Sequence, residues 1–270
     1  TSRAHAIYFY IYSLLVAHWR EFAEDYERMV IVPHGPLHYL PFNALFDGQA
    51  YLLQRFQMSY LPGSSFLQKQ QQARTRSRRS LVMGHTRDGR LPNVPEEVGN
   101  IASALKTGYF LNEESTRARF QADAPASSII HIAAHGDFNP ANPLFSGLHL
   151  SEGILTTLDV FNMRLPASLV TLSACQTGRN LVGGGDELFG LTRAFLTAGT
   201  ASLILSLWPV EDKSTALLMS RLYENLLIGQ PKVAALQNAQ ISLIARGKPL
   251  PEMHPYYWAP FFLIGDPGDL

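Results

Sequence analysis

A chain of 270 residues, 46% of them hydrophobic, can bury a full core, which excludes a disordered protein. Lys plus Arg and Asp plus Glu both number 22, so no net charge favours nucleic acid or an anionic membrane, and we expect neither as a partner. The single cysteine excludes an internal disulfide framework and a cysteine-rich metal site, and it is typical of a cytoplasmic protein.

The beginning of the chain is aromatic and apolar. Residues 6–28 carry apolar side chains at helical spacing and predict an amphipathic helix. Its apolar part, Ala6 to Ala17, is about 12 residues long, against the roughly 20 that a bilayer span needs. No small-x-small cleavage pattern follows it, so we expect a buried helix rather than a leader. Because Thr1 is not a methionine, we expect a piece of a longer protein.

Short elements follow. We expect a strand at 29–32, an ordered proline-rich turn at 33–42 with structural histidines, and one or two strands within 51–60. The polar, basic segment 68–79 has no apolar face, and we interpret it as a solvated helix end and loop. A protease-sensitive linker, or a docking site for an acidic partner, remains the alternative.

From residue 80 on, strand and helix patterns alternate, which is typical of an α/β fold with a sheet covered on both faces. We expect strands at 80–84, 110–111, 129–134, 147–151 (an edge hairpin strand), 169–174, 201–208 and 256–265. We expect helices at 96–106, 116–122, 188–198, 214–227 and 232–246, with Asp186 as an N-cap and Gly199 as a terminator.

Two apolar strands end in chemically active side chains. Residues 129–134 lead into His135-Gly136, and residues 169–174 lead into Cys175. Since open α/β sheets carry their chemistry at the carboxyl ends of strands, we expect His135 to be a base and Cys175 a nucleophile there. The N–H groups of Gly136 and Cys175 are the candidate oxyanion donors.

Two rival sites are rejected on spacing. His131 and His135 have the i, i+4 spacing of zinc proteases, but no glutamate follows the first, and on a strand they stand roughly 13 Å apart. The glycine run 183–185 lacks the following Lys-Ser/Thr of a phosphate loop. We therefore expect no metal and no nucleotide.

Several motifs carry a family resemblance. They are the segments 32–42, 131–136 (His-Ile-Ala-Ala-His-Gly), 169–178 (Leu-Val-Thr-Leu-Ser-Ala-Cys-Gln-Thr-Gly), 193–199, 207–212 (Leu-Trp-Pro-Val-Glu-Asp) and 254–261. Together they resemble the CHAT domain, a caspase-like module often attached to tetratricopeptide repeats and related to separase, gingipains and clostripain. The resemblance covers nearly the whole chain from about residue 10.

The resemblance implies a three-layer α/β/α caspase-like sandwich around a mostly parallel sheet. Within it we expect an N-terminal portion at 1–75 and a catalytic core at 76–270. It also implies a cysteine endopeptidase that uses His135 and Cys175 on a protein or peptide substrate, without a cofactor. A regulatory sensor or repeat region is the expected partner.

The specificity pocket is expected beside the nucleophile strand, formed by Trp208, Glu211 and Asp212, with Asp186 nearby. By resemblance to separase and clostripain, acidic residues there would pair with an arginine or lysine of the substrate. Asp212 has an equal alternative as the N-cap of the following helix. A basic preference would make Arg74 to Arg79 a self-cleavage site.

The alternative to an enzyme is a catalytically silent caspase-like module that binds a protein partner. An intact His135 and Cys175 pair argues against that reading, and cleavage by the wild type but not by Cys175→Ala separates the two.

Overall fold

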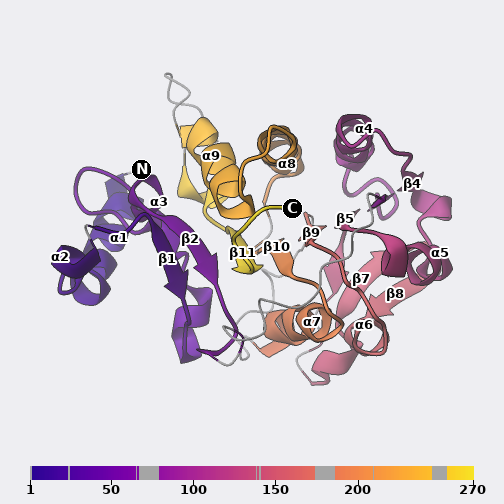
Figure 1. The fold of residues 1–270 in the computed structure, drawn as a ribbon, viewed down its shortest axis with the longest axis horizontal. Helices are drawn as coiled ribbons and strands as arrows, with labels where there is room; N and C mark the ends of the chain where they lie inside the picture. Colours follow the sequence, from indigo (N-terminus) through magenta and orange to yellow (C-terminus); the bar gives the residue numbers. More distant parts are fainter. Residues whose placement is uncertain are drawn as a thin grey trace.

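The computed structural model describes residues 2–23, 25–64, 66, 79–137, 139, 141–173, 186–208, 210–244 and 254–270. Its centre is an eight-stranded sheet in the order β1-β2-β11-β10-β9-β5-β3-β4 (Figure 1). The strands are β1 (Arg28–Ile31), β2 (Gln57–Tyr60), β3 (Ser80–His85), β4 (Phe110–Leu111), β5 (Ile129–Ala134), β9 (Leu169–Leu172), β10 (Ser202–Ser206) and β11 (Phe261–Gly265).

Neighbouring strands of this sheet run parallel, apart from the antiparallel pair β10 and β11. The sheet therefore consists of two parallel blocks that run in opposite directions and join at β10 and β11. The predicted mostly parallel sheet is confirmed. The division of the chain at residue 75 stays a prediction, and β1 and β2 from the first range share this one sheet with the later strands.

Helices cover both faces of the sheet (Figure 1). On one face lie α4 (Val94–Ala104), α8 (Asp212–Leu227) and α9 (Lys232–Ile244), and on the other lie α6 (Thr157–Phe161) and α7 (Asp186–Thr197). The side chains of β5 alternate between the two layers, so that Ile129 and Ala133 belong to one apolar cluster and Ile130 and Ile132 to the other. The three-layer α/β/α arrangement is thus confirmed.

A second, smaller sheet follows β5. It contains β6 (Gly136–Asp137), β7 (Gly147–Leu150) and β8 (Gly153–Thr156), antiparallel in that order. The predicted hairpin strand at 147–151 is found, but its predicted edge position is wrong, because β7 lies in the middle of this sheet. Gly147 allows the close pairing, since a Cβ there would overlap the carbonyl oxygen of Leu155.

The single helix predicted at 6–28 is wrong, because the chain forms α1 (Ser2–Leu15) and α2 (Arg20–Ala23) with a turn between them. The indole N–H of Trp19 donates to the carbonyl of Leu15 at 2.6 Å and satisfies the end of α1. The expected burial of α1 is also wrong. Only one side of α1 packs on the core, and the other side exposes Ile7, Tyr10 and Leu14.

Two predicted strands begin as helices. Residues 52–55 form α3 (Leu52–Arg55) before β2, where the Gln54 side chain accepts from the Tyr51 N–H at 2.9 Å. Residues 255–258 form α10 (Pro255–Trp258) before β11, where His254 Nδ1 accepts from the Tyr256 N–H at 3.1 Å. Aromatic content favours strands, but these local caps determine the outcome.

The other predicted strands and helices lie within a few residues of their expected bounds, including α5 (Arg117–Asp123) after the N-cap Thr116. Gly199 ends α7 with a φ of +109°. In the described part of the chain, no helix has both the length and the apolar character needed to cross a bilayer.

Candidate functional site

The site lies where β5 and β9 end side by side. They pair in parallel from Ile129 opposite Leu169 to Ile132 opposite Leu172, so each residue of β9 stands 40 positions after its partner. The Ser173 N–H donates to the Ile132 carbonyl at 3.1 Å and continues this pairing beyond the strand. His135 follows β5 directly, whereas Cys175, predicted to meet it, lies outside the described residues.

His135 is half-buried at the carboxyl end of β5. Burial lowers the pKa of its imidazole to about 4, with further lowering by the charges of Arg87, His149 and Arg90 and an opposing contribution from Asp137. The ring is therefore neutral near pH 7. A neutral imidazole can accept a proton, which is what a general base requires.

The chain turns into the small sheet at Gly136. The His149 N–H donates to the His135 carbonyl at 2.8 Å, and Gly136 stands opposite Leu148. In an antiparallel ladder this hydrogen bond makes Gly136 and Leu148 a non-hydrogen-bonded pair, so the Gly136 N–H points away from β7. That N–H is free of the ladder, as an oxyanion donor has to be.

The side chain of His149 lies beside that of His135. The two ring centroids are 5.5 Å apart, and His149 Nε2 is 3.3 Å from the Asp137 carboxylate. Sequence reasoning missed both neighbours of His135. The alternation Gly147-Leu148-His149-Leu150 was the available signal, because Leu148 and Leu150 are buried on the opposite face of β7.

A strained turn after β3 supplies the nearby arginines. Arg87, Asp88 and Gly89 all have positive φ angles, of 48°, 57° and 79°, a conformation that is unfavourable for the two non-glycine residues. The turn is anchored by Thr86, whose N–H and hydroxyl both donate to Asn112 Oδ1 at 2.9 Å. Sequence analysis missed this turn, although an Arg-Asp-Gly run soon after a strand indicates one.

His131 occupies a different environment from His135. It is fully buried under α4 and α8, with Nε2 3.0 Å from Glu97 Oε1 and Nδ1 3.3 Å from the Tyr223 hydroxyl. The Tyr223 hydroxyl in turn donates to Thr171 on β9 at 3.2 Å. Both ring nitrogens of His131 are thus engaged in the interior.

The predicted specificity residues fall into two groups. Trp208 and Glu211 follow β10, the strand beside β9, and the Trp208 indole N–H donates to the Tyr256 carbonyl at 3.0 Å. Glu211 is the N-cap residue of α8, so the N-cap alternative for Asp212 is wrong, and Asp212 is the first helical residue. The side chains of Asp212 and Asp186 lie outside the described residues. Helix α7 begins at Asp186, so the prediction of Asp186 as an N-cap is wrong and Asp186 is the first helical residue.

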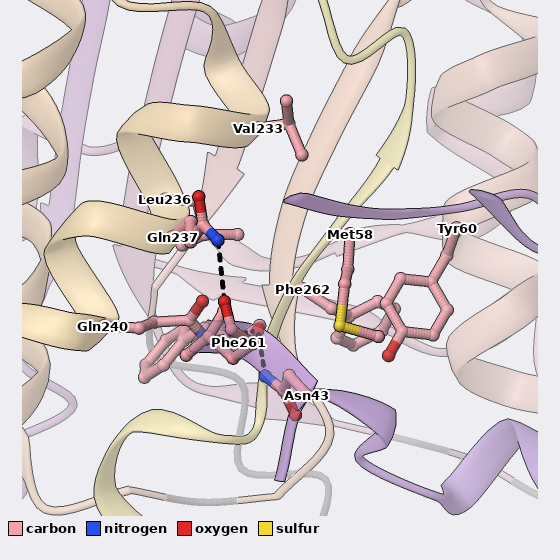
Figure 2. A pocket seen from close by; sticks show the side chains of 10 residues that line it. Asn43, Met58, Tyr60, Val233, Leu236, Gln237, Gln240, Phe261 and Phe262 are labelled. Atoms are coloured by element: carbon pink, nitrogen blue, oxygen red, sulfur yellow. Dashed lines mark hydrogen bonds between the residues drawn. The ribbon is translucent and has the colours of Figure 1, made fainter. Parts of the chain in front are cut away.

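Figure 2 shows a separate cavity between α9 and β11, lined by side chains that include Asn43, Tyr60 and Gln240. The side chains of Asn43 and Gln240 both donate to the Phe261 carbonyl, at 3.3 and 2.9 Å. Its volume of about 10 Å³ is roughly what a single water molecule needs. The cavity is therefore a feature of the packed core and cannot receive a peptide.

Comparisons with known proteins give a family match and two relatives. The CHAT domain family matches residues 4–266. Tetratricopeptide repeat protein 28 of Homo sapiens is 26% identical over 300 residues, which cover 89% of this chain and 12% of that protein. The mouse protein (Mus musculus) matches to the same extent, so the chain spans about an eighth of the length of these relatives.

Solved structures share the fold. The Saccharomyces cerevisiae separase–securin complex superposes with a TM-score of 0.62 at 12% identity, over 86% of this chain and 15% of the matched one. Gingipain R, an Arg-specific cysteine proteinase, superposes with a TM-score of 0.55 at 12% identity, over 79% of this chain and 54% of the matched one. The proteinase RgpB of Porphyromonas gingivalis, in complex with its pro-domain, gives the same TM-score.

At such low identities these likenesses establish the caspase-like fold alone, whereas the family match extends over almost all of the sequence. This chain belongs to the CHAT domain family.

Proposed function

We propose that the chain is a cysteine endopeptidase with His135 and Cys175 as its catalytic pair. The observation that carries the proposal is the strand register, because β5 and β9 are offset by 40 positions and Cys175 likewise stands 40 positions after His135. Both residues also follow strands whose carboxyl ends meet at one edge of the sheet.

In the proposed reaction His135 takes the thiol proton, and the Cys175 thiolate attacks the peptide carbonyl. The imidazolium then gives its proton to the leaving amine as the carbon–nitrogen bond breaks. Water deacylates the thioester after His135 removes its proton. The lowered pKa of His135 leaves the ring unprotonated at neutral pH but makes it a weak base, so the first step depends on the adjacent thiolate, which would raise this pKa and favour the imidazolium as it forms.

The oxyanion is assigned to the N–H groups of Gly136 and Cys175. The orientation of the Gly136 N–H, away from β7, supports its part in this role. In comparable enzymes the loss of one such donor costs about 2.7 to 4 kcal/mol of transition-state stabilisation.

For the substrate we propose a protein or peptide with a basic residue before the scissile bond. Glu211 supports this preference, because it is exposed just past β10, one strand from β9. Its carboxylate accepts a hydrogen bond from Ser214 at 3.2 Å, which holds it in place and leaves its other oxygen for a guanidinium or ammonium group. Asp212, Asp186 and the ring of Trp208 complete the proposed pocket.

A helical repeat region is the proposed regulatory partner. The relative is named for tetratricopeptide repeats, and most of its length lies outside the match. The described chain also exposes an apolar surface on α1, on α2 and on and beside the edge strand β1, which Figure 1 places at one end of the sheet. Its members are Ile7, Tyr10, Leu14, Phe22, Tyr26, Val30 and Val32. Such a surface is typical of protein contacts.

The test is a positional peptide library incubated with the wild type, Cys175→Ala and His135→Ala. Cleavage by the wild type alone, with arginine or lysine before the cut, supports both the reaction and the pocket. Cleavage with another residue there supports the reaction and rejects the pocket.

The second candidate function is a silent module that binds a partner, favoured by the exposed apolar surface of α1 to β1. If the wild type is inert toward the library and binds a repeat partner as tightly as Cys175→Ala does, this function replaces the endopeptidase.

A further inference from the structure

The partly exposed surface around His135 at the end of β5, called the rim below, includes Asp137 and His149. Sequence reasoning did not assign the Asp137 carboxylate to the site. Asp137 Oδ2 lies 3.3 Å from His149 Nε2, and the His149 ring lies beside the His135 ring with centroids 5.5 Å apart. The backbone of His149 holds the backbone of His135 through the 2.8 Å hydrogen bond to its carbonyl. Asp137, His149 and His135 therefore form a continuous chain of contacts.

We propose that Asp137 and His149 form a positioning pair that orients the His135 imidazole and sets the charge around it. This inference rests on the proposed function in so far as His135 is a general base, and it deepens that function by supplying an orienting carboxylate. Asp137 acts through His149, so both are positioning residues and neither is expected to touch the substrate.

The fold directs both side chains to this place. Leu148 and Leu150 are buried on the core side of β7, so the alternation of the strand turns His149 toward His135. Asp137 stands opposite Gly147, whose missing side chain leaves the diagonal path to His149 open.

The contact between Asp137 and His149 is expected to contribute little to the stability of the fold. The side chains of His149 and Asp137 are 21% and 53% exposed, and exposed ion pairs contribute about 0 to 1 kcal/mol to stability. Their influence on His135 is of opposite sign, however, because Asp137 favours its protonated form and His149 disfavours it. The other charges that face His135 are those of Arg87 and Arg90 on the turn after β3, and His85 faces His149.

Because Asp137 and His149 shift the pKa of His135 in opposite directions, substituting each of them tests the proposal. The pKa of His135 is measured by NMR titration in the Cys175→Ala background, where no thiolate contributes, for the parent, Asp137→Asn and His149→Gln. We expect the pKa to fall in Asp137→Asn and to rise in His149→Gln. Asp123→Asn, which removes an exposed carboxylate paired with Arg119 on α5, is the matched control and should leave the titration unchanged.

A kinetic measurement complements the titration in the chain that retains Cys175. Asp137→Asn and His149→Gln should lower kcat about tenfold with KM little changed, since misplacement of a catalytic group can cost up to about a hundredfold. Asp137→Glu, which keeps the carboxylate, should restore most of kcat. Unfolding midpoints of all variants should match that of the parent.

Titrations of His135 that do not move, or that move in the same direction in both variants, overturn the proposal. So do variants that change KM alone. If the wild type cleaves no peptide, the proposed function fails, while the titration still decides whether the pair acts on His135.

Discussion

The two histidines of the His-Ile-Ala-Ala-His-Gly segment, only four positions apart, occupy opposite kinds of environment. His131 is fully buried, and both its ring nitrogens contact polar partners, Glu97 and Tyr223. His135 is half-buried at the end of the strand, beside the charged groups of Asp137, His149 and Arg87. His131 completes a hydrogen-bonded network in the core, whereas the ring of His135 is partly exposed at the end of the strand.

Residue type and spacing therefore do not separate structure from function in this segment. What separates them is the end of the strand, since β5 stops at Ala134 and buries every residue up to that point. Substitutions in the interior should therefore change stability, and substitutions at the rim should change activity or protonation.

The largest expected effect is on the activity of His135→Gln. Removal of a general base costs about 10²–10⁴-fold in rate, and we expect kcat/KM toward the best library peptide to fall by this factor. The unfolding midpoint should stay close to that of the wild type, because the side chain is only half-buried. An unchanged kcat/KM would show that His135 is not the base.

The next largest effect is expected from His131→Leu. This substitution leaves the Glu97 carboxylate, which is fully buried, without its partner, and breaking a buried pair in this way costs about 3 to 5 kcal/mol. Urea denaturation should show this loss at unchanged m-value. Glu97→Gln is the control, since it retains a hydrogen-bonding group opposite His131, and it should cost less.

If His131→Leu instead preserves stability and abolishes cleavage by the folded protein, the interior histidine belongs to the catalytic machinery. The contrast between the two histidines would then fail.

Buried strands were easier to predict from the sequence than locally capped helices. Strand β5 was predicted with its observed bounds, because a run of buried apolar residues determines a parallel strand almost by itself. Helix α10 was missed, because in Pro255–Trp258 a local cap outweighs the strand preference of aromatic residues. Local hydrogen bonds of this kind leave little trace in hydrophobic periodicity.

The surroundings of the site were predicted less well than the fold. His135 and Gly136 follow from the strand that precedes them, but the contact of His149 with Asp137 depends on the register of β6 and β7. The turn with Arg87 depends on three successive positive φ angles and on the distant Asn112. Such contacts arise from tertiary structure, which short motifs do not encode.

A smaller effect is expected from Gly147→Ala, which tests the support of the rim. A Cβ at this position would overlap the Leu155 carbonyl, a backbone atom that cannot move without displacing β8. Overpacking of this kind costs about 1 to 3 kcal/mol. Thermal unfolding should show the loss, and the NMR signals of His135 and His149 should shift. Gly153→Ala is a comparison with a different cause, because a Cβ there meets nothing within 4 Å and only its φ of +116° is strained.

The smallest effect is expected on the pH dependence of stability. The pKa of His135 is about 4 in the folded chain against an ordinary value of 6.5, so the unfolded chain binds more protons between these values. Its contribution to stability is therefore complete above pH 6.5 and is lost as the pH falls toward 4. Solvent screening reduces the size of this loss, since the ring is only half-buried.

Arg87→Gln should diminish that loss, because Arg87 lowers the pKa of His135 and its removal raises the pKa toward the ordinary value. The measurement is the unfolding free energy at pH 7 and pH 4.5 for the wild type, Arg87→Gln and His135→Gln. The decrease between the two pH values should be largest in the wild type, smaller in Arg87→Gln and smallest in His135→Gln. Equal decreases in all three would mean that the rim charges leave the protonation of His135 unaffected, and the electrostatic difference between the rim and the interior would lose its basis.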